Sequence, residues 1–144
     1  MTLPHVSFYL LNESVPDGKL RAACRLTRKV VSQGYTAYIL TSSDEQARRL
    51  DDLLWTFEQG SFVPHRLDGG QQDPAPVVIG CDPPEADPPY LLISLSRDTP
   101  DHFHVYRRIA EVVDCSDEDR QLARQLYRTY RERGCPLDTH YIKP

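Results

Sequence analysis

The chain has 144 residues (16.5 kDa) and a net charge of −4, with 40% hydrophobic and 26% charged residues. This composition excludes wholesale disorder. No apolar run approaches the ~20 residues of a membrane-spanning helix, and the N-terminus lacks the apolar core of a signal peptide. We therefore expect one domain, residues 1–144, in the cytoplasm and without membrane contact.

Residue spacing gives no sign of a metal, cofactor or catalytic site. Four scattered cysteines, with no C-x-x-C pair, predict inert thiols rather than disulfides or a zinc site. The histidines and paired carboxylates also lack the spacing of ligands or of a catalytic pair. An acidic chain with a pI near 5.7 argues against direct binding of nucleic acid.

The first half of the chain alternates strand and helix patterns. A buried strand is predicted at residues 6–11, an amphipathic helix at 19–32 and a second strand at 35–40. This order predicts parallel strands joined by a right-handed crossover. A second helix follows, from within residues 41–45 to Phe57, and Gly60 ends it. Capping boxes are predicted for two helices, from Ser42–Glu45 or Ser43–Gln46 and from Ser116–Asp119.

Residues 68–89 differ in composition, because they hold six of the twelve prolines and three of the seven glycines. Only residues 76–79 predict a strand there, so we expect surface loops at about 68–76 and 81–89.

The remaining elements are a strong strand, a short helix, a final strand and a last helix, predicted at residues 90–95, 102–109, 110–114 and 117–133. The tail, residues 135–144, is expected to be partly ordered at best.

Five strands interleaved with helices predict a single three-layer α/β/α domain with a mostly parallel, Rossmann-like sheet. Such folds often bind nucleotides at the carboxyl ends of their strands. The sequence, however, contains no G-x-G-x-x-G, no G-x-x-x-x-G-K-[ST] and no G-x-S-x-G motif. A nucleotide-binding or hydrolytic α/β enzyme is therefore kept only as the alternative function.

The last helix carries a charge asymmetry. Residues 120–133 contain five arginines and one glutamate (+4), so the rest of the chain sums to −8. Arg120, Arg124, Arg128 and Arg131 fall within an arc of about 80° on a helix, and Tyr127 borders it. The apolar residues predicted to face the sheet are Leu122, Ala123, Leu126 and Tyr130.

Two interpretations of this arginine arc are open. One is an ordinary solvated face of an amphipathic helix. The other is a docking site for an acidic peptide with an apolar anchor beside Tyr127, because arginine binds carboxylates bidentately whereas lysine would serve solubility equally well.

Six short motifs occur in a fixed order along the chain. They are FYLL at 8–11, DEQA-x-x-LD-x-x-LW at 44–55, FVPH at 62–65, LISL at 92–95, EVVD at 111–114 and LAR-x-x-Y-x-x-YR at 122–131. Together, and at this chain length, they resemble the chi subunit of bacterial DNA polymerase III holoenzyme.

The resemblance implies a non-catalytic accessory subunit that links the clamp loader, through the psi subunit, to single-stranded-DNA-binding protein. The ligand from that protein is its acidic C-terminal tail, which ends in Pro-Phe. The family's tail site matches Arg120, Arg124 and Tyr127, and the arginine arc adds Arg128. Residues 114–120 form a segment about three residues shorter than in relatives, so Cys115 is the nearest candidate for the apolar floor of the phenylalanine pocket.

The resemblance also assigns contacts with psi, and with a helicase, to Trp55 and Phe62; we add the adjacent Val63 and Pro64 to this surface. From the residues alone, Trp55 at a helix end fits a cap on the core as well as an interface. Direct binding of single-stranded DNA by the arginine helix is a third function to test.

Overall fold

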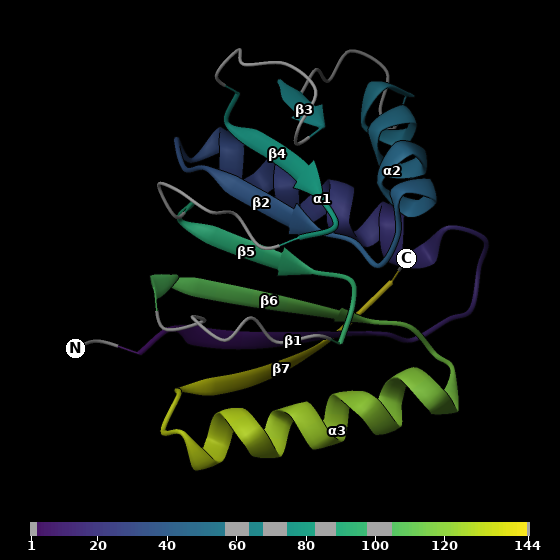
Figure 1. The fold of residues 1–144 in the computed structure, drawn as a ribbon. Coiled ribbons are helices and arrows are strands. Elements are labelled where there is room, and N and C mark those ends of the chain that lie inside the picture. Colours follow the sequence, from purple (N-terminus) through teal and green to yellow (C-terminus); the bar gives the residue numbers. More distant parts are fainter. Residues whose placement is uncertain (1–2, 57–63, 68–74, 83–88, 98–104, 144) are drawn as a thin grey trace.

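The computed structural model describes residues 3–56, 64–67, 75–82, 89–97 and 105–143. In this part of the chain, seven strands form one sheet in the order β3-β4-β2-β5-β6-β1-β7 (Figure 1). The strands are β1 (His5–Leu11), β2 (Ala37–Leu40), β3 (His65–Leu67), β4 (Val77–Gly80), β5 (Leu91–Ser94), β6 (Arg108–Val113) and β7 (Leu137–Ile142). The helices are α1 (Gly18–Ser32), α2 (Asp44–Thr56) and α3 (Asp117–Glu132).

All neighbouring strands pair in parallel. Helices α1 and α2 pack on one face of the sheet and α3 packs on the other (Figure 1). The predicted α/β class, with its parallel sheet and three layers, is confirmed.

Each face of the sheet has its own hydrophobic core, because successive side chains of a strand point to opposite faces. Val6 and Phe8 of β1 pack under α3 with Tyr130, whereas Leu11 belongs to the cluster under α1 and α2. The inner strands β2 and β5 are buried along their whole length, which explains their continuous apolar sequences.

The sheet has seven strands rather than about five, and the two additional strands, β3 and β7, are its edges. Strand β7 also corrects the expectation of a poorly ordered tail, because residues 137–142 pair with β1 from Val6–Leu137 to Leu11–Ile142. An edge strand is covered less than an inner one, so β7 lacks the continuous apolar run that marks inner strands.

The short helix expected at residues 102–109 also requires correction. Arg108 and Ile109 begin β6 instead, where the fully buried Ile109 lies between Val6 and Leu92. Residues 98–104 lie outside the described residues, as do 57–63 and most of the two proline-rich loops (68–74 and 83–88).

Serine side chains begin the helices that frame both candidate surfaces. Ser43 Oγ accepts a hydrogen bond from the Gln46 main-chain N–H at 3.1 Å, so the second of the two predicted capping pairs is used. Ser116 Oγ accepts from the Asp119 N–H at 3.1 Å at the start of α3, as predicted. These bonds fix where α2 and α3 begin.

No helix among the described residues has the length and hydropathy needed to cross a bilayer. All four cysteines are free. Cys24 is buried in the core, and this burial raises the pKa of its thiol to about 12, which fits an inert thiol. Cys81 and Cys115 are only half-buried.

Candidate functional site

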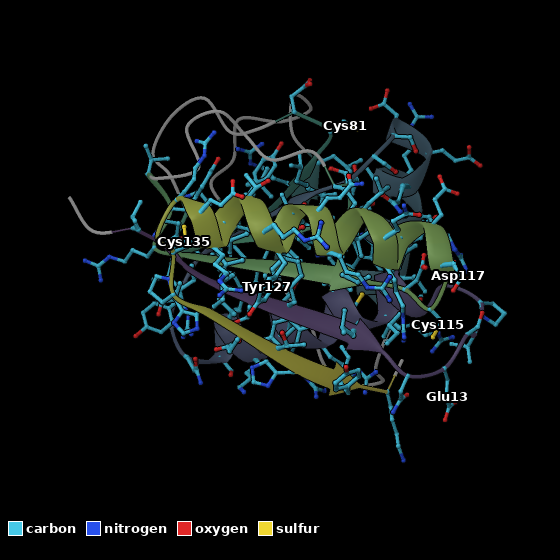
Figure 2. The ribbon with its side chains drawn as sticks, turned by 90° about the horizontal axis from the view of Figure 1, so that it is seen from below. Glu13, Cys81, Cys115, Asp117, Tyr127 and Cys135 are labelled. Carbon is cyan, nitrogen blue, oxygen red and sulfur yellow. The ribbon has the colours of Figure 1, made fainter. Side chains whose placement is uncertain are left out.

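A groove of about 370 Å³ runs between α3 and the β1–β7 edge of the sheet. Figure 2 views this side, with Tyr127 on the flank of α3 that faces β7. The groove is lined by Phe8, Leu10, Arg120, Ala123, Arg124, Tyr127, Arg128, Arg131, Thr139 and Tyr141. The structure therefore brings the four predicted α3 residues of the tail site (Arg120, Arg124, Tyr127 and Arg128) to one cavity.

The arginines of the groove differ in how firmly they are held. Arg124, Arg128 and Arg131 are exposed. Arg120 is half-buried, and its Nη2 donates to the main-chain carbonyl of Leu11 at 2.9 Å. One cation of the groove is thus fixed in place before any ligand arrives, while the other three lie along the open side.

Tyr127 is half-buried at the edge of the α3 core, as the helical spacing predicts. Its ring lies 5.5 Å from that of Phe8, tilted by 54°, and Phe8 in turn meets Tyr130 edge-on at 6.3 Å. The Tyr130 hydroxyl donates to Glu111 Oε2 at 3.0 Å, inside the core. This chain of contacts fixes the Tyr127 ring as a rigid wall beside the groove.

Strand β7 supplies the opposite wall of the groove through Thr139 and Tyr141, the latter 70% exposed. On its other face, the Asp138 carboxylate contacts the Nε2 atoms of His5 at 2.5 Å and His140 at 3.0 Å. The contact with His5, the first residue of β1, holds β7 beside β1, whereas His140 lies on β7 itself. The sequence prediction missed this wall, because the order Leu-Asp-Thr-His-Tyr-Ile of residues 137–142 neither alternates strictly nor forms an apolar run.

Two expectations about this region are not met, one for the pocket floor and one for the apolar face of the last helix. Cys115 is not among the described residues that line the groove. Its Sγ donates to the Leu11 carbonyl at 2.9 Å, and its side chain packs against the cluster under α1. The apolar floor comes instead from Phe8, Leu10 and Ala123. The expectation that Leu122 faces the sheet is wrong, because its side chain is 41% exposed on the flank of α3.

The second predicted surface lies at the opposite edge of the sheet. Trp55, near the end of α2, is 56% exposed, so it does not cap the core. Its indole meets the imidazole of His65, the first residue of β3, and the preceding Pro64 is exposed. Phe62 and Val63 lie outside the described residues.

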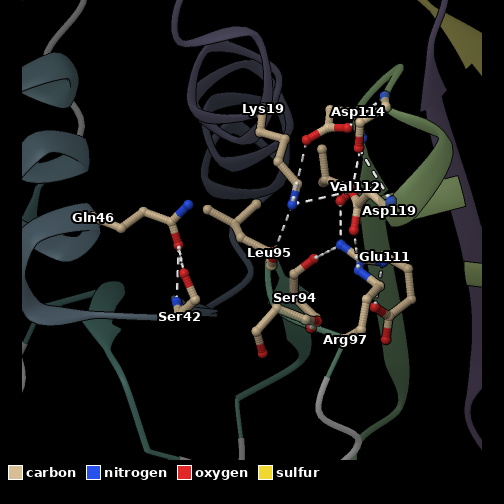
Figure 3. Close-up of polar contacts among 12 residues, drawn as sticks. Lys19, Ser42, Gln46, Ser94, Leu95, Arg97, Glu111, Val112, Asp114 and Asp119 are labelled. Carbon is tan, nitrogen blue, oxygen red and sulfur yellow. Dashed lines mark hydrogen bonds and ion pairs between the residues drawn. The ribbon is translucent and has the colours of Figure 1, made fainter. Parts of the chain in front are cut away.

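A buried ion-pair network closes the carboxyl ends of β5 and β6 (Figure 3). Arg97 pairs with Glu111 at 3.0 Å and with Asp119 at 3.2 Å. Lys19 pairs with Asp119 at 3.1 Å and donates to the Leu95 carbonyl at 2.9 Å. Burial raises the pKa of Glu111 to about 6, although the charge of Arg97 opposes this shift.

This network lies at the carboxyl ends of two strands, the end of the sheet where α/β proteins hold a nucleotide. The charges of the protein satisfy one another there, which counts against the enzyme alternative. In the described part of the chain, no three His, Cys, Asp or Glu side chains form a group suited to a metal ion.

Comparison with known proteins gives one consistent family. Residues 3–138 match the family model described as "DNA polymerase III chi subunit, HolC". The chain is 36% identical to the DNA polymerase III subunit chi of Pseudomonas aeruginosa over 140 residues, which cover 97% of this chain and 98% of that protein. It is 32% identical to the protein of the same name from Escherichia coli (strain K12), over 95% of this chain and 97% of that protein.

A third relative, the DNA polymerase III subunit chi of Haemophilus influenzae, is 31% identical over 94% of this chain and 95% of its own length. These matches confirm the resemblance drawn from the six motifs. With it they confirm the prediction of an accessory subunit rather than an enzyme.

Proposed function

Because this chain belongs to the family of DNA polymerase III chi subunits, we propose that it is an adaptor of the bacterial replisome. It joins psi, and through psi the clamp loader, to the acidic C-terminal tail of single-stranded-DNA-binding protein. We place this adaptor function in the cytoplasm, where DNA is replicated. The observation that carries the proposal is the groove, in which four arginines and Tyr127 border an apolar floor.

The chemistry of the groove matches a ligand that is both acidic and aromatic. Aspartates of the tail pair with Arg120, Arg124 and Arg128, while the terminal phenylalanine buries its ring beside Tyr127 and over Phe8. Exposed ion pairs contribute ~0.2–1 kcal/mol each, whereas a buried phenylalanine contributes roughly 1.5–3 kcal/mol. The aromatic end therefore decides whether the tail binds, and the arginines set the association rate and the salt dependence.

The second half of the adaptor is the surface around Trp55, to which we assign psi. An exposed tryptophan is typical of an interface hot spot, and Pro64, the chain neighbour of its contact residue His65, is exposed as well. Trp55 packs at the β3 edge of the sheet, and the groove lies at the β7 edge, with five strands between the two edges. Because the two surfaces share no residue, psi and the tail are able to bind at the same time.

The decisive experiment titrates the chain with a synthetic acidic peptide ending in Pro-Phe and measures binding by calorimetry at several salt concentrations. We expect one binding site whose affinity falls as salt rises and is lost when the terminal phenylalanine is removed. A single-stranded oligonucleotide at low salt is the control. Binding of the oligonucleotide, without binding of the peptide, would refute the proposal in favour of direct DNA binding.

Simultaneous binding is tested by size-exclusion chromatography of the chain with psi and intact single-stranded-DNA-binding protein. We expect all three in one peak. Displacement of psi by the tail peptide would contradict the adaptor role, even if each partner binds alone.

A further inference from the structure

Trp55 rests on a buried histidine. The centroids of the Trp55 indole and the His65 imidazole lie 4.9 Å apart, and the two rings are tilted by 57°. The side chain of His65 is completely buried, whereas Trp55 is more than half exposed. The imidazole is thus a fixed inner partner for a ring that protrudes from the surface.

His65 is itself held by α2. Its Nε2 lies 3.1 Å from Oδ1 of Asp51, which is 25% exposed. Asp51 and Trp55 are four residues apart on α2, so they lie on the same face of the helix, one turn from each other. The His65 imidazole therefore lies between two side chains of α2. The Asp51 carboxylate contacts its Nε2, and the Trp55 indole contacts the ring.

We propose that Asp51 and His65 are positioning residues that hold the Trp55 indole outward, ready to receive an apolar segment of a partner. The inference rests on the proposed function, in which Trp55 contacts psi. Ordering a mobile side chain during association lowers affinity by about two- to tenfold. An indole that is already ordered by His65 avoids this loss.

The chain contains a single tryptophan, so its intrinsic fluorescence reports on Trp55 alone. We would measure acrylamide quenching and time-resolved anisotropy in the free full-length chain. In His65→Ala and Asp51→Ala we expect faster indole motion, because side-chain motion at exposed sites is fast once released. We also expect the quenching constant to rise about 1.5- to twofold, because acrylamide then reaches the face of the indole that His65 contacts. The matched control is Asp52→Ala, which removes the neighbouring exposed carboxylate and leaves the Asp51–His65 contact intact.

A second variant separates positioning from folding. His65→Phe keeps a buried aromatic ring beneath the indole but lacks the nitrogen that meets Asp51, so it should loosen the indole about as much as Asp51→Ala does and less than His65→Ala does. Thermal unfolding followed by circular dichroism identifies any variant that fails to fold. Affinity for psi should fall about two- to tenfold in His65→Ala and Asp51→Ala, and stay unchanged in Asp52→Ala.

The outcomes are distinct. Quenching and anisotropy equal to those of Asp52→Ala in both test variants would overturn the positioning role. A mobile indole with undiminished affinity for psi would overturn its use in docking. Full affinity for psi in Trp55→Ala would instead refute the proposed psi surface itself, and the fluorescence of the free chain tells these failures apart because it requires no partner.

Discussion

The Tyr127 ring lies 5.5 Å from the ring of Phe8 and is tilted against it by 54°, so the wall of the groove is continuous with the core beneath α3. A ligand that packs against Tyr127 meets a side chain that has already lost its freedom. This rigidity is the physical reason to expect that one aromatic residue of the ligand dominates binding.

Replacing Tyr127 with alanine should weaken binding of the Pro-Phe peptide about tenfold or more, because the wall for the terminal phenylalanine is lost. Calorimetry measures the affinity, and circular dichroism checks the fold. Tyr127→Phe, which keeps the ring, should bind nearly normally. Tyr35→Ala, on an exposed tyrosine outside the groove, is the control; an equal loss of affinity there would contradict the assignment.

Arg124→Ala and Arg128→Ala should each lower the affinity for the Pro-Phe peptide about two- to fivefold, since each removes one exposed ion pair. Each should also flatten the dependence of affinity on salt. Arg133→Ala removes the same charge from α3's C-terminal cap, outside the groove lining. If Arg133→Ala changed the salt dependence as much, the groove arginines would act only through overall charge.

Arg120→Ala should differ from its neighbours, because Arg120 also donates to the Leu11 carbonyl. We expect a loss of about 1 kcal/mol in the free energy of unfolding in addition to weaker peptide binding. Denaturant titration measures the first effect and calorimetry the second. Arg124→Ala should show only the binding effect, so equal stabilities of the two variants would exclude the structural role of Arg120.

Trp55→Ala and Phe62→Ala should impair association with psi while leaving affinity for the tail peptide unchanged. The exposed indole is a typical hot-spot residue, and the groove lies at the other edge of the sheet. Copurification with psi and peptide calorimetry on the same preparation measure both effects. Psi retained at wild-type levels in both variants would count against this surface.

Glu111 should make the protein less stable as pH rises from about 4.5 to about 6. Its folded-state pKa is raised to about 6 by burial, above its ordinary value of 4.5, so the folded state binds the proton more tightly than the unfolded chain does. Below pH about 4.5, Glu111 is protonated in both the folded and the unfolded state, and stability is not reduced. Above pH about 6, the loss in the free energy of unfolding is complete, at about 2 kcal/mol.

Glu111→Gln should remove this part of the pH dependence, since glutamine does not ionise and its side-chain oxygen still accepts from the Tyr130 hydroxyl. Denaturant unfolding at several pH values between 4.5 and 7 compares the two proteins. In this variant Arg97 loses one charged partner and keeps Asp119, which changes the absolute stability. The comparison is therefore between the slopes of the free energy of unfolding against pH. Identical slopes would show that Glu111 does not titrate in this range.

Elements with strong local signals were predicted well. The five inner strands and the helices α1, α2 and α3 follow from apolar periodicity and capping residues, and Ser116 begins α3 as expected. The two missed strands, β3 and β7, are the edges of the sheet. Their residues are half-buried in β3 and half-buried or exposed in β7, so the pattern that distinguishes a strand from a loop is weak in them.

The sequence alone determined the helical arc on which Arg120, Arg124, Tyr127 and Arg128 meet, because spacing along one helix is a local property. Only the tertiary structure decided that this arc borders a groove, since the opposite wall, Thr139 and Tyr141, depends on the pairing of β7 with β1. That pairing joins residues more than a hundred positions apart. The exposure of Trp55 was decided in the same way, because it depends on which elements pack around the end of α2, and no local periodicity encodes that packing.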